Sequence, residues 1–172
     1  MQKSFTLVEL DALPDNPFHM IGEEWMLITA GALDRYNTMT ASWGGFGVLW
    51  NKPVAMVFIR PVRFTYDFME RHQEFTLSFF ESRYRSALEF CGSHSGRDVN
   101  KALETELTPI ATDNGSVAFS QVRLILECRR LYSDDLRPSR FFDPEIEKNY
   151  PKKDYHRMYI GQILQCWRSP SV

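Results

Sequence analysis

The stretch Tyr36-Asn-Thr-Met-Thr-Ala-Ser-Trp43, followed at once by Gly44-Gly-Phe-Gly47, decides the fold class of this 172-residue chain. Successive residues of a β-strand point to opposite faces, so the stretch would place a row of hydroxyl side chains on one face and an amide and apolar groups on the other. The glycines then relax the backbone before a second short strand. The pattern predicts a strand with one polar face, formed by Thr38, Thr40 and Ser42.

More strands are predicted on both sides of this stretch. Short apolar runs that end at glycine or at a turn indicate buried strands, and strict alternation indicates half-buried ones. The last alternating segment would place His156, Met158, Ile160 and Leu164 on one face. Together the predicted strands cover residues 25–31, 36–43, 48–50, 54–59, 75–80, 121–132 and 155–167.

Two short helices are predicted between these strands. In the first, Thr65 would be the N-cap and Phe64 would pack on Met69. The second is expected over residues 84–91 and would be closed by Gly92.

The number and order of these elements favour a mainly β fold with short helices. Six or seven strands without regular strand–helix alternation are typical of an antiparallel barrel. Residues 133–154 are rich in Asp, Pro and Lys, and we expect a surface excursion without a core of its own. We expect a single domain over residues 1–172, since a chain of this length buries roughly two thirds of its unfolded surface.

The composition excludes several classes of partner. Lys and Arg number 20 and Asp and Glu number 22, a net charge of −2 without any block of five like charges, so no nucleic-acid partner is expected. No apolar run approaches the roughly 20 residues that cross a bilayer, so no membrane partner is expected. Cys91, Cys128 and Cys166 are odd in number and far apart, which favours reduced thiols and a cytoplasmic location.

The first candidate site is an anion seat at the start of the first helix. A helix N-terminus presents unpaired N–H groups and a partial positive charge, and Arg60 and Arg63 lie just upstream of Thr65. Charge-assisted donors of this kind suit a phosphate group. The alternative is an ordinary strand-to-helix turn with two solvated arginines.

Two further features are candidates for binding. The hydroxyl row on the strand over residues 36–43 would hydrogen-bond the edge of a heteroaromatic ring, unless this is a solvent-facing edge strand in which threonine is simply frequent. The loop Gly92-Ser-His-Ser-Gly-Arg-Asp98 combines small residues, hydroxyls and one arginine, a composition that forms anion-binding backbone nests. It would equally suit a helix end followed by a turn.

Other patterns carry no site. Gly45-Phe-Gly47 lacks the third glycine and the helix that a dinucleotide fingerprint requires. Cys91 and His94 have the spacing of a metal-ligand pair, but there is no second pair, so no metal site is predicted. At the apolar end of a helix, Cys91 is expected to be a buried structural thiol and not a nucleophile. His156 is expected to be a core or interface histidine unless a ligand faces it.

Four segments together resemble the flavoredoxin-like branch of the flavin reductase family, the FMN-binding split barrels. They are similar in motif, order and spacing, and the likeness extends from about Trp25 to Ile163. The segments are Asn37-Thr-Met-Thr-Ala-Ser-Trp-Gly44, Arg60-Pro-Val-Arg-Phe-Thr-Tyr66, Cys91-Gly-Ser-His-Ser-Gly-Arg-Asp98 and Tyr155-His-Arg-Met-Tyr-Ile-Gly161.

The resemblance implies a six-stranded antiparallel split β-barrel, a homodimer, and FMN held non-covalently near the subunit interface. It also implies that His156 lies toward the flavin and nicotinamide side, where it would act in catalysis. The residues that would flank the flavin ring are Asn37, Thr38, Met39, Thr40, Ala41, Ser42 and Trp43. Those that would hold the phosphate end and the ribityl chain are Arg60, Arg63, Thr65, Tyr66, Ser95, Gly96, Arg97 and Lys101.

Two departures weaken the expectation of nicotinamide reductase activity more than that of FMN binding. The chain has Lys153-Asp-Tyr-His156 where the more familiar reductases carry Gly-Asp-His. It also has Gly161-Gln-Ile163 where Gly-Glu-Ile or Gly-Glu-Val is usual.

The resemblance leads to an FMN-dependent redox protein as the main hypothesis. Its electron donor would be NADH or NADPH, as in a flavin or ferric reductase, or a redox protein such as a ferredoxin. One alternative is a flavin-binding module that stores or senses FMN without turnover. Another is an unrelated small barrel whose polar stripe is only an exposed face.

Overall fold

The computed structural model of the chain describes residues 5–13 and 15–170. Its main element is an antiparallel sheet with the strand order β3-β2-β6-β9-β10-β5-β4, and β1 pairs with the far end of β10. The strands of this sheet are β1 (Thr6–Leu7), β2 (Met26–Ala32), β3 (Arg35–Ala41), β4 (Gly44–Leu49), β5 (Lys52–Ile59), β6 (Glu74–Phe79), β9 (Leu124–Asp135) and β10 (Arg157–Arg168). A separate hairpin consists of β7 (Pro109–Ala111) and β8 (Val117–Phe119).

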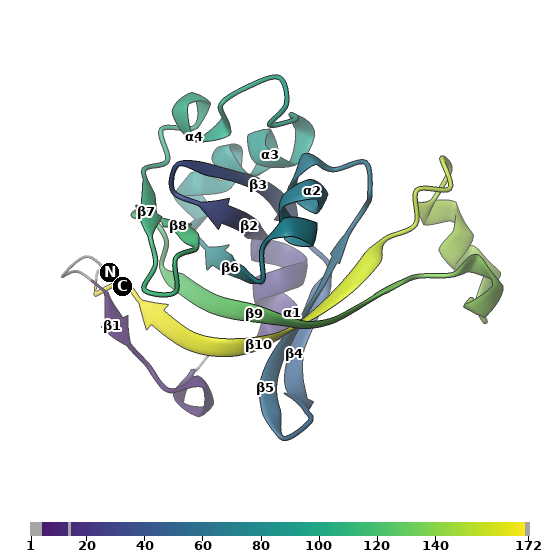
Figure 1. Cartoon of the computed structure of the whole chain (residues 1–172), viewed down its shortest axis with the longest axis horizontal. Coiled ribbons are helices and arrows are strands. Elements are labelled where there is room, and N and C mark those ends of the chain that lie inside the picture. Colours follow the sequence, from purple (N-terminus) through teal and green to yellow (C-terminus); the bar gives the residue numbers. More distant parts are fainter. Residues whose placement is uncertain (1–4, 14, 171–172) are drawn as a thin grey trace.

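Short helices cover parts of this sheet (Figure 1). Two of them, α2 (Phe64–Arg71) and α3 (Arg85–Ser93), both pack on β3. The other helical elements are α1 (Pro17–His19), a π-helical turn over Met20–Glu24, α4 (Lys101–Glu104), and 3-10 helices over Leu10–Ala12, Ser82–Tyr84, Pro138–Arg140 and Pro144–Asn149.

The mainly β split-barrel class is confirmed, but the strand number is higher than expected. Within the described residues the main sheet has eight strands, whereas the resemblance implied six and the sequence pattern six or seven. The strand of this sheet that was not predicted is β1, and the glycines that follow β3 belong to β4 instead of forming a loop. A Cβ atom at Gly44 would lie 2.8 Å from the carbonyl oxygen of Met56, so glycine lets β4 approach β5 closely.

The central part of the sheet is buried on both of its faces, and two hydrophobic cores result. Neighbouring residues of one strand point to different cores: Ile28 and Leu126 lie in the first, whereas Leu27 and Ile125 lie in the second. Residues 124–128 of β9 are accordingly all buried, Glu127 included. A strand that is covered by helices and a hairpin on its second side does not need that side to be polar.

The two long strands β9 and β10 carry the geometry toward the candidate site. In Figure 1 they run together and continue into a projecting connection, residues 136–156, which we call the arm. Pairing of β10 with β9 skips Leu164, so the alternation changes there and the predicted single face through Leu164 is wrong. His156 is the last residue of the arm, immediately before β10, and not a strand residue.

Both helix predictions need a correction at their ends. The N-cap of α2 is Arg63, not Thr65, whose buried hydroxyl accepts a hydrogen bond from Asn37. Phe64 packs edge-on against Phe68, with ring centroids 5.1 Å apart, and against the core cluster that contains Met69. Helix α3 continues through Gly92, where a Cβ atom would lie 3.3 Å from that of Thr40, so this glycine serves close packing on β3.

Candidate functional site

Two adjoining pockets bring most of the predicted site residues together. The small pocket, of 160 Å³, is lined by residues 39–43 with Phe58, Arg60, Arg63 and His156. The basic pocket, of 480 Å³, shares Met39, Arg60 and Arg63 with the small one, so the two adjoin, and together we call them the groove. The other residues of the basic pocket are Asn37, Val62, Phe64, Thr65, Ser93, His94, Ser95, Gly96, Lys101, Pro151, Lys152 and Asp154.

The polar groups at the start of β3 are hydrogen-bonded within the protein. Asn37 donates from Nδ2 to Oγ1 of Thr65 over 2.7 Å, and the hydroxyls of Thr38 and Thr29 share a hydrogen bond of 2.8 Å. The Thr40 hydroxyl donates to the carbonyl oxygen of Leu88 in α3. These side chains are not a solvent-facing stripe. Asn37 and Thr40 line the groove, and their polar side-chain groups already have partners within the protein.

One end of the small pocket carries a hydroxyl without a hydrogen-bond partner in the described residues and a partly exposed indole ring. Ser42 is half-buried, and its hydroxyl has no hydrogen-bond partner in the part of the chain that the structure describes. Trp43 is 45% exposed, and its ring lies 5.2 Å from the ring of His156. A hydroxyl and an exposed indole at one place suit the edge and the face of a planar ring.

His156 is a neutral imidazole in this site. Its Nδ1 and the hydroxyl of Tyr150 share a hydrogen bond of 2.9 Å. Burial, helped by the positive charges of Arg60 and Arg63, lowers the pKa of His156 to about 4, although Asp154 opposes the shift. The ring therefore carries no charge at neutral pH.

Arg60 is tied to the arm. Its Nη1 donates to Oδ1 of Asp154 and its Nη2 to the carbonyl oxygen of Asn149, each over 2.8 Å. The guanidinium also lies 5.1 Å from the ring centre of Tyr150. Arg60 is thus not a solvated arginine, and it holds residues 149–154 against the groove.

Arg63 and Lys101 supply positive charge inside the basic pocket. Arg63 donates from Nη1 to the carbonyl oxygen of Gly92 over 2.6 Å. Lys101 is buried and donates from Nζ to the carbonyl oxygens of Thr38 and Cys91. Burial, together with the charge of Arg63, lowers the pKa of Lys101 to about 8. Two cations that are desolvated side by side gain from an anion between them.

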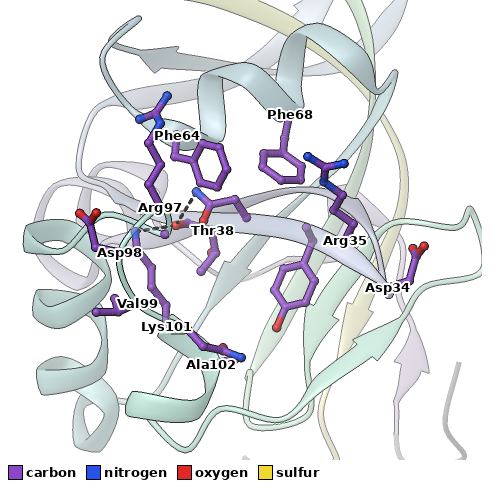
Figure 2. A pocket seen from close by; sticks show the side chains of 14 residues that line it. Asp34, Arg35, Thr38, Phe64, Phe68, Arg97, Asp98, Val99, Lys101 and Ala102 are labelled. Carbon is purple, nitrogen blue, oxygen red and sulfur yellow. Dashed lines mark hydrogen bonds between the residues drawn. The ribbon is translucent and has the colours of Figure 1, made fainter.

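The loop after α3 closes the groove on the side of Lys101. A Cβ atom at Gly96 would lie 1.8 Å from Oδ1 of Asn37, so the loop backbone rests on this side chain. Arg97 lies over the ring of Phe64 at 4.6 Å and pairs with Asp67 over 2.9 Å. Figure 2 shows Arg97 and Phe64 together in a neighbouring cavity of 420 Å³, which Lys101 also lines. The loop is latched to α2, and the outer cavity adjoins the basic pocket, since Asn37, Phe64, Gly96 and Lys101 line both.

The structure brings together most, but not all, of the predicted residues. Thr38 and Arg97 line the outer cavity and not the groove. Tyr66 lines none of these three pockets and instead contacts Tyr159 and the guanidinium of Arg157. Residues that the sequence analysis missed are Phe58, Val62, Phe64, Ser93, His94, Pro151, Lys152 and Asp154.

Some of the missed residues left a signal in the sequence. Ser93 and His94 belong to the loop over residues 92–98 that was a candidate for binding, and Asp154 stands two positions before His156 in an unusual motif. Pro151 and Lys152 come from the arm, and their place in the groove depends on how the arm folds back, which no local pattern encodes.

The arrangement fits a molecule with a planar ring at one end and a phosphate at the other. The small pocket offers an exposed indole, a free hydroxyl and a neutral imidazole. The basic pocket offers Arg63 and Lys101, with Asp154 as a carboxylate already paired to Arg60. Among the described residues no group of three His, Cys, Asp or Glu side chains lies close enough to hold a metal ion, and no helix is long and apolar enough to cross a membrane.

Comparisons with known proteins agree with this fit. Residues 19–171 match the family model described as a flavin reductase-like domain. None of the curated proteins is similar enough in sequence to match the chain.

Several solved structures share the fold. An FMN-binding domain of a flavin reductases-like enzyme from Shewanella baltica OS155 is 17% identical with a TM-score of 0.70, and the alignment covers 96% of this chain and 77% of that one. The flavoredoxin of Desulfovibrio vulgaris (Miyazaki F) is 20% identical with a TM-score of 0.68, and the alignment covers 95% of this chain and 77% of that one. An NADH:FAD oxidoreductase from Streptomyces globisporus C-1027, solved with NAD and FAD fragments, is 15% identical with a TM-score of 0.64, and the alignment covers 86% of this chain and 76% of that one.

Proposed function

The chain belongs to the flavin reductase-like family, and we propose that it is an FMN-dependent redox protein of the flavin reductase or flavoredoxin type. It would pass electrons between NADH, NADPH or a redox protein and a flavin or another acceptor. The observation that carries the proposal is the groove, because its two ends match the two ends of FMN. The basic pocket suits the phosphate, and the small pocket with its aromatic side chains suits the flavin ring. This membership also rules out an unrelated small barrel as the explanation of the β3 motif.

The phosphate of FMN would be held in the basic pocket. Arg63 and Lys101 would supply the charge, and Ser95 and Gly96 would supply the loop that closes over it. Arg60 would act at the same end but through the arm, since its guanidinium already pairs with Asp154. These are hydrogen-bonding and ionic roles, and no side chain here needs to act as a nucleophile.

The flavin ring would lie at the small pocket. The backbone of residues 39–41 with the Ser42 hydroxyl would hydrogen-bond its edge, and Trp43 and His156 would border it. FMN supplies the electron chemistry when it is bound, by accepting or giving a hydride at its ring nitrogen N5. The protein would orient the ring, set its charge environment and limit its contact with water.

A homodimer in the cytoplasm completes the proposal. The β4–β5 hairpin exposes Val48 (79%) and Trp50 (53%), and the Trp50 ring contacts that of Tyr132, which is itself exposed. Exposed apolar and aromatic groups that gather on one surface are typical of an interface. The three described cysteines are buried free thiols, in keeping with a reducing compartment.

The test is an anaerobic titration of the purified protein. A yellow protein with flavin absorbance, bleached rapidly by NADH or NADPH, supports the reductase form of the proposal. A yellow protein that neither nicotinamide reduces, but that a reduced ferredoxin does, supports the electron-carrier form. If only a chemical reductant bleaches it, the alternative of a non-catalytic flavin-binding module is correct. A colourless protein that does not take up added FMN overturns the proposal.

A further inference from the structure

The arm carries two buried residues, Tyr150 and, at its end, His156. Of residues 136–155, all of which the structure describes, only Tyr150 is buried, at 2% exposure. The rings of Phe141 and Tyr155 lie 6.0 and 4.9 Å from its ring, and the Arg60 guanidinium lies 5.1 Å from its centre. These contacts fix the phenol in one place, with its hydroxyl 2.9 Å from Nδ1 of His156.

The hydrogen-bond count decides which of these two groups donates. Within the described residues the Tyr150 hydroxyl has only His156 as a partner. If the phenol oxygen accepted a hydrogen bond from Nδ1–H, the phenol's own O–H would stay buried and unpaired, which costs the desolvation of that group. Burial also raises the pKa of Tyr150, so the phenol keeps its proton at neutral pH. The phenol therefore donates, and Nδ1 accepts.

The acceptor role of Nδ1 determines the protonation state of the other ring nitrogen, Nε2. The charged groups that act on this imidazole are Arg60 after β5, Arg63 before α2 and Asp154 in the arm, and with burial they leave it neutral. In a neutral imidazole one nitrogen donates and the other accepts, so Nε2 carries the proton. Nε2 has no hydrogen-bond partner among the described residues, and His156 lines the small pocket whereas Tyr150 does not.

We propose that Tyr150 is a positioning residue that holds His156 as a neutral Nε2–H donor directed into the small pocket. The inference rests on the proposed function and deepens it, because it names the chemistry of the group that His156 meets. That group is a hydrogen-bond acceptor on the edge of a heteroaromatic ring, a carbonyl oxygen or an unprotonated nitrogen. A fixed donor there stabilises an acceptor atom that gains negative charge when the ring is reduced. His156 is then a hydrogen-bond donor and not a general acid.

The first experiment measures the imidazole itself, in protein without FMN. Ring ¹⁵N spectra of ¹⁵N-labelled protein, with His156→Gln to assign the signal, report which nitrogen is protonated and how the ring titrates. We expect a protonated Nε2 and a hydrogen-bonded, unprotonated Nδ1. In Tyr150→Phe the Nδ1 signal should move and the pKa of His156 should rise, because the bond that favours the neutral ring is lost. A protonated Nδ1 in the wild type, or an unchanged signal and pKa in Tyr150→Phe, overturns the inference.

Tyr155→Phe is the matched control. Its ring belongs to the same aromatic cluster, but its hydroxyl donates to Glu147, so the His156 signal should stay as in the wild type. A similar shift in both variants would mean that ring packing, not the hydroxyl, sets the imidazole, and would also overturn the inference.

The second experiment uses FMN-loaded protein. In Tyr150→Phe the limiting rate of flavin reduction should fall roughly three- to tenfold, while FMN affinity stays within about twofold, because the lost interaction is a single hydrogen bond. A wild-type rate in this variant overturns the role toward the ring. If neither the wild type nor Tyr150→Phe binds FMN, the proposed function fails. The spectra of the FMN-free protein still decide the Tyr150–His156 relationship.

Discussion

Arg63 donates a hydrogen bond from Nη1 to the carbonyl oxygen of Gly92 over 2.6 Å. This bond joins the N-cap of α2 to the last turn of α3, and both helices pack on β3. The guanidinium therefore has a structural partner on one side while it lines both pockets of the groove on the other. It is the cation on which the proposed phosphate contact depends most.

Replacing this arginine should remove the preference for a phosphate. We expect Arg63→Ala to weaken FMN binding by about tenfold to a hundredfold, since a charge-assisted hydrogen bond contributes roughly 1.5–3 kcal/mol. Riboflavin, which has no phosphate, should bind the variant and the wild type alike. Calorimetric titration of both ligands measures this, with Arg83→Ala as an exposed-arginine control outside the groove. Equal weakening of FMN and riboflavin would mean that Arg63 acts through α3.

The backbone at position 96 should tolerate no side chain. In Gly96→Ala the new methyl group would lie 1.8 Å from Oδ1 of Asn37, so either the loop or this buried amide must move. We expect a stability loss of about 1–3 kcal/mol, typical of overpacking, together with weaker FMN binding. Gly47→Ala is the control, because nothing lies within 4 Å of a Cβ atom there. Chemical denaturation decides it, and equal stability of the two variants would contradict the close contact.

Acid should destabilise the protein partly through His156. Its pKa is about 4 in the folded protein against 6.5 for the free side chain, so only the unfolded state takes up this proton between those values. Stability from this group is complete above pH 6.5 and is lost as the pH falls toward 4, by about 3 kcal/mol in all. In His156→Gln the unfolding free energy should depend less steeply on pH over this window. If the unfolding free energy of His156→Gln depends on pH between 7 and 4 as steeply as that of the wild type, the imidazole of His156 titrates normally.

The FMN-loaded protein should be a dimer in solution. Light scattering should give twice the 20.1 kDa mass of one chain. Trp50→Glu should shift the protein toward the monomer, because it places a charge in the exposed aromatic patch of the β4–β5 hairpin. Phe142→Glu is the control, since Phe142 is fully exposed on the arm, away from the hairpin. A wild-type mass that corresponds to one chain would contradict the dimer.

The candidate site was predictable where its residues belong to short local motifs. The segments around Asn37, Arg60 and Ser95 were predicted to serve one ligand, and the structure places them around one groove. The hydrogen bonds that the Thr38 and Thr40 hydroxyls form within the protein were not predictable, because their partners, Thr29 and Leu88, lie on other elements. Tyr66 follows Thr65 in the sequence, but its ring lies against that of Tyr159 and lines neither pocket of the groove.

The sequence by itself determined the mainly β class, through the alternation of residues 36–43 and the apolar runs, and it singled out the segments around Asn37, Arg60 and Ser95 that line the groove. Only the tertiary structure decided that Arg60 pairs with Asp154, 94 residues away, and that Tyr150 of the arm holds His156. Alternation and turn residues act on neighbours along the chain, so they are readable one segment at a time. Burial and hydrogen-bond pairing depend instead on which distant side chains meet when the two cores close, and no local pattern contains that information.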